Sequence, residues 1–153
     1  MSAEAIFSMS NLFAMAGWLI LVIAPRKRWA TTTAGVVMPL TLAALYLLLL
    51  VSRYGEARGG FSSLPAVATL FSNSWLLLAG WIHYLAFDLF VGAWEVRDAS
   101  RHGIPHLLVV PCLLLTFMFG PIGFMAYCAL RTIGAGRFTP SVSTSRSPHP
   151  SDR

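Results

Sequence analysis

Two ionisable residues, His83 and Asp88, lie within one long apolar run of the sequence. A charged carboxylate at the centre of a membrane helix costs roughly 2.5–3.5 kcal/mol on insertion scales, so Asp88 must be neutral or must have a partner. An ionisable side chain at this depth predicts a functional site by default. Two structural alternatives stay open: Asp88 could clamp helices together, and His83 could form a hydrogen bond to another helix.

The spacing of these two residues limits how they could cooperate. Five residues apart, they lie roughly 140° apart around a helix axis, so they do not stack as residues four apart would. Each therefore needs a partner on another helix, or both must flank one cavity. Tyr84 lies one turn before Asp88 on the same face, and Gly80 and Gly92 extend that stripe. Small residues let another helix approach closely, so we expect Asp88 to face the interior of a helix bundle.

Three further polar residues are candidates for binding a substrate: Tyr84, His106 and Asn11. Tyr84 could equally belong to the core. His106 opens the last apolar run and could instead cap a helix at the membrane interface. Asn11 lies early in the first apolar run and is one candidate partner for Asp88. A polar connector follows the third run, and we expect its charged residues to be solvated: Glu95, Arg97, Asp98 and Arg101.

The histidines and cysteines do not have the spacing of a metal site. His102 and His106 are one helical turn apart only if no break lies between them, and Pro105 favours a break. Cys112 and Cys128 both lie in the last apolar run, about 24 Å apart if that run is one helix. That distance excludes a disulfide between them, and two cysteines alone do not make a metal site. We expect no metal, no haem and no other cofactor.

Composition places the whole chain in a membrane. Of its 153 residues, 56% are apolar and only 11% are charged, against roughly 25% charged in an ordinary soluble domain. The mean hydropathy is +0.68. A soluble protein of this length could not hide so much apolar surface from water, whereas a bilayer accepts it. The chain is therefore one small membrane domain with no room for a separate soluble catalytic domain.

The net charge of +5 does not indicate a nucleic-acid partner. The basic residues lie outside the apolar runs, where they suit anionic lipid headgroups and control of topology. They are Arg26, Lys27, Arg28, Arg53, Arg58, Arg97, Arg101, and those from Arg131 onward. Membrane lipid is the partner that this arrangement predicts.

The apolar runs predict an all-α, polytopic membrane bundle over residues 1–131. We expect about four transmembrane helices, over residues 6–24, 31–52, 75–94 and 105–130. Residues 61–73 are too short to span and are broken by Pro65, so we interpret them as an interfacial or re-entrant segment. In the fourth run, F-G-P-I-G at 119–123 is the likeliest break. Residues 132–153 have the composition of a disordered basic tail.

Two groups of basic residues make opposite predictions for the orientation of the chain. The Arg26-Lys27-Arg28 cluster favours a cytoplasmic first loop, which with four spans places both termini outside. The basic residues from Arg131 onward favour the opposite. Because the first helix usually dominates, we expect outside termini.

The third apolar run carries a pattern that resembles a known family. Residues 81–90 read W-I-H-x4-D-L-F, which is similar to the core motif of the abscisic-acid-deficient-four-like membrane proteins, whose plant members are the neoxanthin synthases. The segments L-F-S at 70–72, F-G-P-I-G at 119–123 and I-A-P at 23–25 are also similar. The resemblance spans roughly residues 11–130.

The resemblance implies a small polytopic membrane fold and an isomerisation. The plant members are linked to opening an epoxide ring of violaxanthin and forming the allene of neoxanthin, with no net redox change. This reaction needs an acid to protonate the epoxide oxygen and a base to remove a proton from the polyene beside the ring. The resemblance implies Asp88, neutral in a low-dielectric medium, as the acid and His83 as the base, or the reverse.

The sequence departs from the plant members at its start. No plastid transit peptide is evident, because Met1 to Ser10 are too few and include Glu4. We therefore expect a bacterial inner-membrane protein or a mature form. Many bacteria make carotenoids but not neoxanthin, so the resemblance transfers the fold better than the substrate.

Two functions stay open. The first is an isomerase of carotenoid or isoprenoid tailoring, which uses Asp88 and His83 on an apolar substrate. The second is a non-enzymatic membrane protein that binds or organises lipid or pigment, with Asp88 and His83 holding helices together. Transport by so short a bundle would need an oligomer, and the sequence leaves the oligomeric state open.

Overall fold

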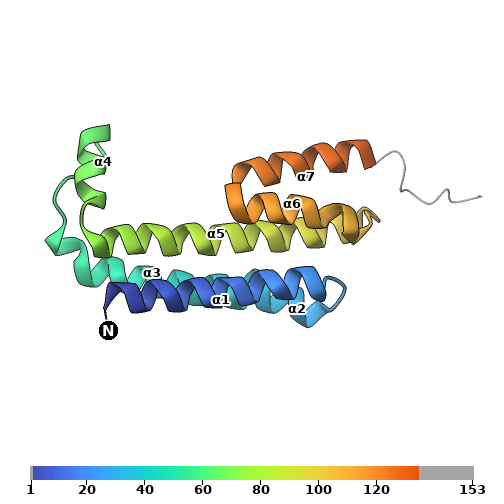
Figure 1. Cartoon of the computed structure of the whole chain (residues 1–153), viewed down its shortest axis with the longest axis horizontal. Coiled ribbons are helices and arrows are strands. Elements are labelled where there is room, and N and C mark those ends of the chain that lie inside the picture. The colour runs from blue at the N-terminus through green and yellow to red at the C-terminus, as the bar shows by residue number, and fades with distance from the viewer. Residues whose placement is uncertain (1, 135–153) are drawn as a thin grey trace, which may run out of the picture.

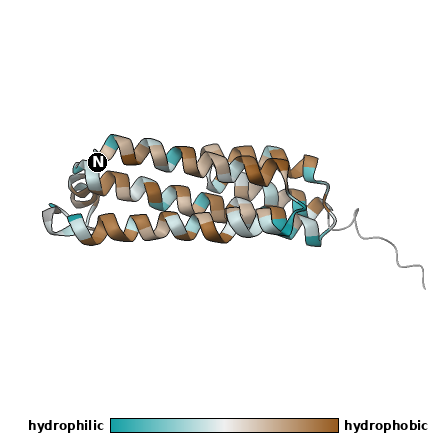
Figure 2. Cartoon of the chain, turned by 90° about the horizontal axis from the view of Figure 1, so that it is seen from below, coloured by the Kyte–Doolittle hydropathy of each residue, from teal (hydrophilic) through white to brown (hydrophobic). Residues whose placement is uncertain are grey.

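Three long helices lie side by side and form the body of the protein (Figure 1). The computed structural model describes residues 2–134, which contain no strand. The long helices are α1 (Ala3–Ile23), the continuous stretch Arg28–Arg53 and α5 (Ser74–Arg101), and each is long and apolar enough to cross a membrane. Hydrophobic residues dominate the middle of these helices in Figure 2, and hydrophilic residues collect near the ends. The expected all-α, polytopic membrane fold is confirmed.

Side-chain caps fix where two of the long helices begin. The hydroxyl of Ser2 accepts a hydrogen bond from the backbone N–H of Ala5 at the start of α1. The Oδ1 atom of Asn73 accepts from the N–H groups of Trp75 and Leu76 at the start of α5. These caps satisfy backbone donors that have no partner inside a helix.

The second long helix changes its winding before a proline. It begins as α2 (Arg28–Thr32), continues as one π-helical turn, η1 (Thr33–Val37), and becomes α3 (Met38–Arg53). Pro39 has no N–H and cannot continue the regular hydrogen-bond ladder, and the N–H of Met38 bonds to the carbonyl of Thr33, five residues back. In this turn Gly35 approaches α5 so closely that an added Cβ would lie 2.6 Å from the Cβ of Ala93.

A short helix stands across the long helices at one end of the bundle (Figure 1). It is α4 (Leu64–Phe71), reached from α3 through the single 3₁₀ turn η2 (Tyr54–Glu56). Its eight residues are too few to span a membrane. Phe71 packs against Gly80 of α5, where an added Cβ would lie 2.8 Å from the ring. The segment expected to be interfacial or re-entrant is therefore a short helix at the bundle end.

The range predicted as a fourth span is instead a helical hairpin, so that prediction is wrong. Residues 106–134 form α6 (His106–Phe119) and α7 (Pro121–Gly134), which fold back on each other beside one half of α5. Gly120, with φ of 50°, makes the reversal, and Gly123 packs directly on Thr116. Each helix is about 21 Å long, too short to cross a bilayer of ~30 Å. The break expected at 119–123 is the turn of the hairpin.

The hairpin also changes the predicted topology. With three crossings, the start of α1 and the end of α7 lie at opposite ends of the bundle (Figure 1). Four spans would have placed both termini on one side, whereas this arrangement predicts termini on opposite sides of the membrane. The predicted separation of about 24 Å between Cys112 and Cys128 fails too, since they lie on different helices. The predicted tail, 132–153, falls mostly outside the described residues.

Most of the described basic residues lie at one end of the bundle, and the α6–α7 hairpin adds Arg131 to that end. We call this the basic end; it comprises the loop at 24–27, the turn at 102–105 and the last turn of α7. Its basic residues are Arg26, Lys27, Arg28, Arg97, Arg101 and Arg131, whereas the α4 end has Arg53 and Arg58. The positive-inside rule therefore predicts a cytoplasmic basic end, and the first loop and the end of α7 now agree.

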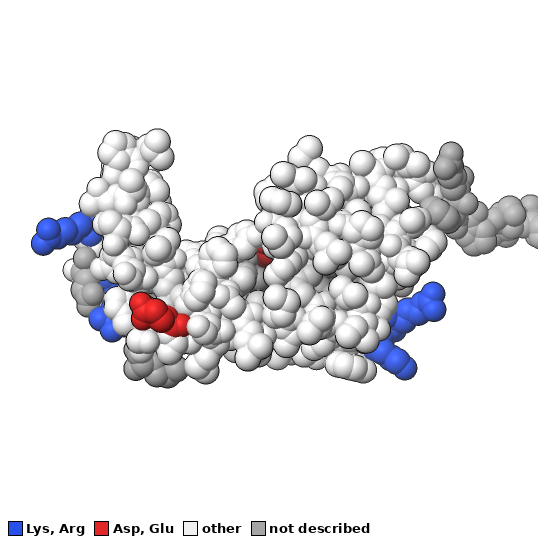
Figure 3. Space-filling view, viewed as in Figure 1, with Lys and Arg blue, Asp and Glu red and all other residues white. Residues whose placement is uncertain are grey.

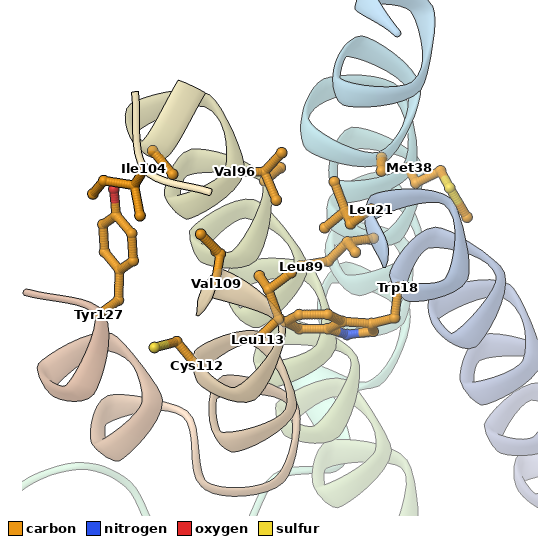
Figure 4. Close-up of a cluster of buried hydrophobic side chains, with 13 residues drawn as sticks. Trp18, Leu21, Met38, Leu89, Val96, Ile104, Val109, Cys112, Leu113 and Tyr127 are labelled. Atoms are coloured by element: carbon orange, nitrogen blue, oxygen red, sulfur yellow. The ribbon is translucent and has the colours of Figure 1, made fainter. Parts of the chain in front are cut away.

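The core lies where α5 meets the other helices (Figure 4). Trp18 and Leu21 of α1 pack with Leu89 of α5 and Leu113 of α6 in one buried cluster. Gly92 makes this close approach possible, because an added Cβ there would lie 2.6 Å from the Trp18 ring. The expectation that glycines on the Asp88 stripe admit close packing is confirmed.

The topology predicts which introduced cysteines share a membrane face. In a Cys112→Ala, Cys128→Ala background, we expect Lys27→Cys and Thr132→Cys to react alike with a membrane-impermeant maleimide, and Ser2→Cys to react from the opposite side. In intact cells only Ser2→Cys should be labelled, and permeabilisation should expose the other two. Labelling of Ser2→Cys and Thr132→Cys from the same side would restore the four-span topology.

The hairpin should depend on the absence of a side chain at position 123. We expect Gly123→Ala to destabilise the protein by about 1–3 kcal/mol, because the methyl group of the introduced alanine would overlap the Thr116 backbone. Thermal melting in detergent would measure the loss. Gly55→Ala is the control, since an added Cβ there meets nothing within 4 Å. Equal melting temperatures for the two variants would contradict the packing described.

Candidate functional site

Asp88 lies at the middle of α5, about 20 Å from either end of that helix. It faces the turn of the α6–α7 hairpin, where an added Cβ on Gly120 would lie 3.2 Å from its Oδ1 atom. Each arm of the hairpin is about 21 Å long, so its turn lies beside the middle of α5 and not at the far end of the bundle. A glycine is required at the turn both by its positive φ and by the nearby carboxyl group.

The Asp88 carboxyl group lies close enough to the Tyr84 hydroxyl to interact with it, but among the described residues no hydrogen bond of good geometry forms at its Oδ2 atom. Its Oδ2 atom is buried and lacks a hydrogen-bond partner. The neighbouring Tyr84 hydroxyl donates to the carbonyl of Phe117 at 3.4 Å, near the end of α6. That bond satisfies a backbone oxygen at membrane depth, where water is not available to do so. Asp88 therefore keeps one oxygen free to bind or transfer a proton to a ligand.

A cleft of about 280 Å³ opens beside Asp88, and we call it the Asp88 cleft. Asn11 and Trp81 stand at its other side, and the Nε1–H of Trp81 donates to the Oδ1 atom of Asn11 at 2.8 Å. Asn11, a candidate partner for Asp88, thus bonds to Trp81 instead, although Asn11 and Asp88 both line the cleft. The remaining lining is mostly apolar and aromatic: Ala14, Met15, Trp18, Tyr84, Leu85, Phe117 and Met118.

Figure 3 shows the hollow on this side of the molecule, between α4 and the α6–α7 hairpin. Acidic atoms are visible at its floor, midway along the long axis, and basic side chains stand at the two ends. An acidic group on an apolar floor at this depth can serve as a proton donor or as an anchor for a hydroxyl group.

The structure does not bring His83 to the Asp88 cleft. His83 is exposed and lines a different cleft of about 260 Å³ between α3, α4 and α5, together with Tyr46 and Phe71. Its ring lies 4.7 Å from the ring of Phe87 and 5.5 Å from that of Tyr46. Of the two arrangements that the sequence left open, separate neighbours fit the structure and one shared cavity does not, because the separation of His83 and Asp88 around α5 points them at different helices.

His106 is also remote from Asp88. It begins α6 at the basic end, and its Nε2 atom lies 3.1 Å from the carbonyl oxygen of Val22 in the last turn of α1. Carbonyl groups in the last turn of a helix have no N–H partner within that helix, so the His106 ring can satisfy this one. Of its two sequence interpretations, a cap at the interface fits this contact, and the role of a third site residue does not.

Two buried carboxyl groups were missed by the sequence interpretation. Glu95 is fully buried, and its Oε1 atom accepts from the hydroxyl of Thr116 at 2.9 Å, while its Oε2 atom has no partner among the described residues. Asp98 is also buried, and its Oδ2 atom accepts from the Tyr127 hydroxyl at 2.7 Å and pairs with Arg131 at 3.2 Å. The expectation of a solvated connector is wrong for Glu95 and Asp98, which lie buried on a continuous α5, whereas Arg101 is exposed as expected.

A signal for these residues was present in the sequence. No glycine or proline lies between Trp94 and Arg101, so nothing there terminates a helix. Asp88 and Glu95 are seven residues apart, which places them on the same face two turns apart. Within residues 2–134 no group of three His, Cys, Asp or Glu side chains is close enough to hold a metal ion.

Comparison with protein families gives a match over most of the chain. The model of the ABA DEFICIENT 4-like (ABA4-like) family matches residues 5–127. The chain belongs to the ABA4-like family. The resemblance noted from the W-I-H-x4-D-L-F pattern is thereby confirmed. No curated protein and no solved structure matches the chain.

The match covers α1 to α6 and about half of α7. It therefore includes every residue of the Asp88 cleft and the buried carboxyl groups of α5. Membership of the ABA4-like family and the three long apolar helices together identify an integral membrane protein.

The buried contact between Glu95 and Thr116 should show non-additive energetics. We expect Thr116→Val to destabilise the protein by about 1–3 kcal/mol, because it leaves the Glu95 carboxyl without a donor. The double variant Glu95→Met, Thr116→Val should lose less than the sum of the two single variants. Thermal unfolding in detergent would measure all three, and strict additivity would contradict a direct interaction.

Proposed function

We propose that this ABA4-like protein is an intramembrane isomerase of carotenoid-like or isoprenoid substrates, with Asp88 as its catalytic acid. The observation that supports this most strongly is the Oδ2 atom of Asp88, buried and without a partner beside an apolar cleft. Among the described residues Glu95 also has an unpartnered oxygen, but of the two carboxyl groups it is Asp88 that lines an open cleft. The cleft is lined by apolar and aromatic side chains that suit a polyene or isoprenoid body.

The chemistry proposed is the opening of an epoxide next to a polyene. The Asp88 carboxylic acid gives its proton to the epoxide oxygen, and the adjacent C–O bond breaks. A neighbouring carbon then loses its proton, its C–H electron pair forms a new C=C bond, and the epoxide oxygen is left as a hydroxyl group. Substrate and product have the same atoms and the same oxidation level, so no oxidant, reductant or cofactor is consumed.

The base in this scheme differs from the one that the resemblance implied. His83 faces another cleft, so we assign the base to the second oxygen of the Asp88 carboxyl group. One oxygen donates a proton while the other accepts the proton from carbon, and the carboxyl group ends neutral as it began. Such bifunctional transfer avoids a separated charge pair in a low-dielectric medium, which is costly.

The other residues of the cleft would position the substrate. The Tyr84 hydroxyl stays bound to the Phe117 carbonyl and holds the hairpin turn against α5. The Asn11–Trp81 hydrogen bond fixes the indole ring at the opposite wall, where 40% of the Trp81 surface is exposed. An indole face of this kind packs well against a conjugated chain.

A non-enzymatic role in binding pigment or lipid is the second candidate. It is favoured by a purely apolar cleft between α3 and α5, on another side of the bundle from Asp88, which no polar residue lines. Its walls are Pro39, Leu40, Ala43, Ala86, Phe87 and Phe90. For location, we propose the inner membrane of a bacterium, with the basic end in the cytoplasm.

Replacement of Asp88 separates the two candidates. In a host that makes epoxide-bearing carotenoids, the wild-type chain should change the retention time and absorption of the pigment without changing its mass. Asp88→Asn removes the proton and should lower the rate by at least about a hundredfold. Unchanged pigment with the wild-type chain, across several supplied epoxides, would favour the binding role.

Two further variants complete this experiment. Glu4→Gln makes the same change of acid to amide at an exposed residue of α1 and should leave the reaction intact. His83→Gln tests the origin of the base. If it abolishes the reaction while the protein still folds and inserts, the assignment of both proton transfers to Asp88 is wrong.

A further inference from the structure

The Asp88 cleft continues into a second cleft along the seam between α1 and α6. This second cleft is lined only by apolar and aromatic residues: Met15, Trp18, Leu19, Val22, Leu113, Leu114 and Phe117. Met15, Trp18 and Phe117 line both clefts, so the two form one groove, which we call the α1–α6 groove. Along α1 it extends from Asn11 to Val22, about 17 Å, and it approaches the basic end.

The walls of this groove are open to lipid. Leu19 is 53% exposed and Leu114 is 56% exposed, so a molecule can enter sideways from the bilayer. Trp18 and Phe117 meet edge to face at the junction of the two clefts, with ring centroids 5.6 Å apart. Beyond them lies Asp88, whose Oδ2 atom is buried and lacks a hydrogen-bond partner among the described residues, and the groove continues past it to Asn11 and Trp81.

The depth of Asp88 limits what can occupy the groove. An ordinary phospholipid keeps its charged headgroup at the membrane surface, about 20 Å from Asp88 along α5. Only its acyl chain could reach this depth, and a hydrocarbon chain offers no partner to the carboxyl group. The free oxygen instead matches a small, uncharged polar group carried on a long apolar body, because a hydroxyl or epoxide costs far less to bring to this depth than a charge.

We propose that the α1–α6 groove binds an uncharged long-chain lipid that carries one hydroxyl or epoxide group. The polar group lies at Asp88, the chain passes Trp18 and Phe117, and its apolar end lies near Leu19 and Leu114, toward the basic end. This inference rests on the proposed function in taking the Asp88 cleft as the place of reaction. It adds the direction of the substrate, its single polar end and its lateral entry from lipid.

Photochemical labelling would test the direction of binding. The full chain in lipid nanodiscs is illuminated with a twenty-carbon isoprenoid alcohol that carries a diazirine at its apolar end. We expect labelled peptides to be enriched around residues 19–22 and 113–114, relative to labelling by a phospholipid with a diazirine at the end of its acyl chain. The same distribution of label from both probes, or enrichment between α3 and α5, would overturn the proposal.

A matched pair of variants tests the groove itself. Leu19→Trp fills the groove and should lower labelling by the alcohol severalfold. Leu40→Trp makes the same change at a residue that is 64% exposed and lines the cleft between α3 and α5, and it should leave labelling unchanged. If Leu40→Trp lowers labelling as much as Leu19→Trp does, the groove is not the binding site.

The outcomes distinguish the groove from the reaction. If the groove is labelled but every supplied pigment stays unchanged, the proposed binding site is supported and the proposed isomerase activity is contradicted. If the pigment still changes in Leu19→Trp and no labelling is enriched in the groove, the isomerase activity is supported and the proposed binding site is contradicted.

Discussion

The structure depends on the helix reversal at Gly120, which stops the last part of the chain halfway along α5. Inside a bilayer, a reversal must satisfy its own backbone groups. The N–H of Gly120 bonds to the carbonyl of Thr116, and the carbonyl of Gly120 accepts from Gly123 and Phe124. The Tyr84 hydroxyl donates to the carbonyl of Phe117 in the last turn of α6. Once the reversal is placed at this depth, Asp88 has a turn beside it instead of lipid, and a cleft can form.

Polar contacts decide where the α6–α7 hairpin sits on α5. Burial of apolar surface gives little preference between helix and lipid in a membrane, so packing and hydrogen bonds determine the register. The contact between Glu95 and Thr116 fixes α6, and the contacts of Asp98 with Tyr127 and Arg131 fix α7. These carboxyl groups are part of the reason that α5 is long. Their burial requires the helix to continue to the basic end, where the hairpin covers them.

The single carboxyl group at mid-depth limits the chemistry that the protein can perform. A histidine in another cleft cannot share a proton with Asp88, so a reaction there must use one group for both transfers or use the substrate itself. The same geometry separates the polar site from water at both ends of the bundle. The groove proposed for an apolar substrate leads to this site along the apolar lining from Met15 to Val22.

The sequence by itself determined the membrane fold, three of the spans, the break near Gly120 and the presence of an acid, Asp88, at membrane depth. These follow from local properties: run length, the glycine and proline at the break, and the cost of an acid in hydrocarbon. Only the tertiary structure decided that residues 105–130 reverse rather than span, that Glu95 and Asp98 are buried, and that His83 and Asp88 serve different clefts. A mostly apolar run of 26 residues, 105–130, is long enough either for one transmembrane helix or for two short helices that each reach the middle of the bilayer. The choice between them rests on contacts such as that of Gly123 with Thr116, which join residues on two separate helices.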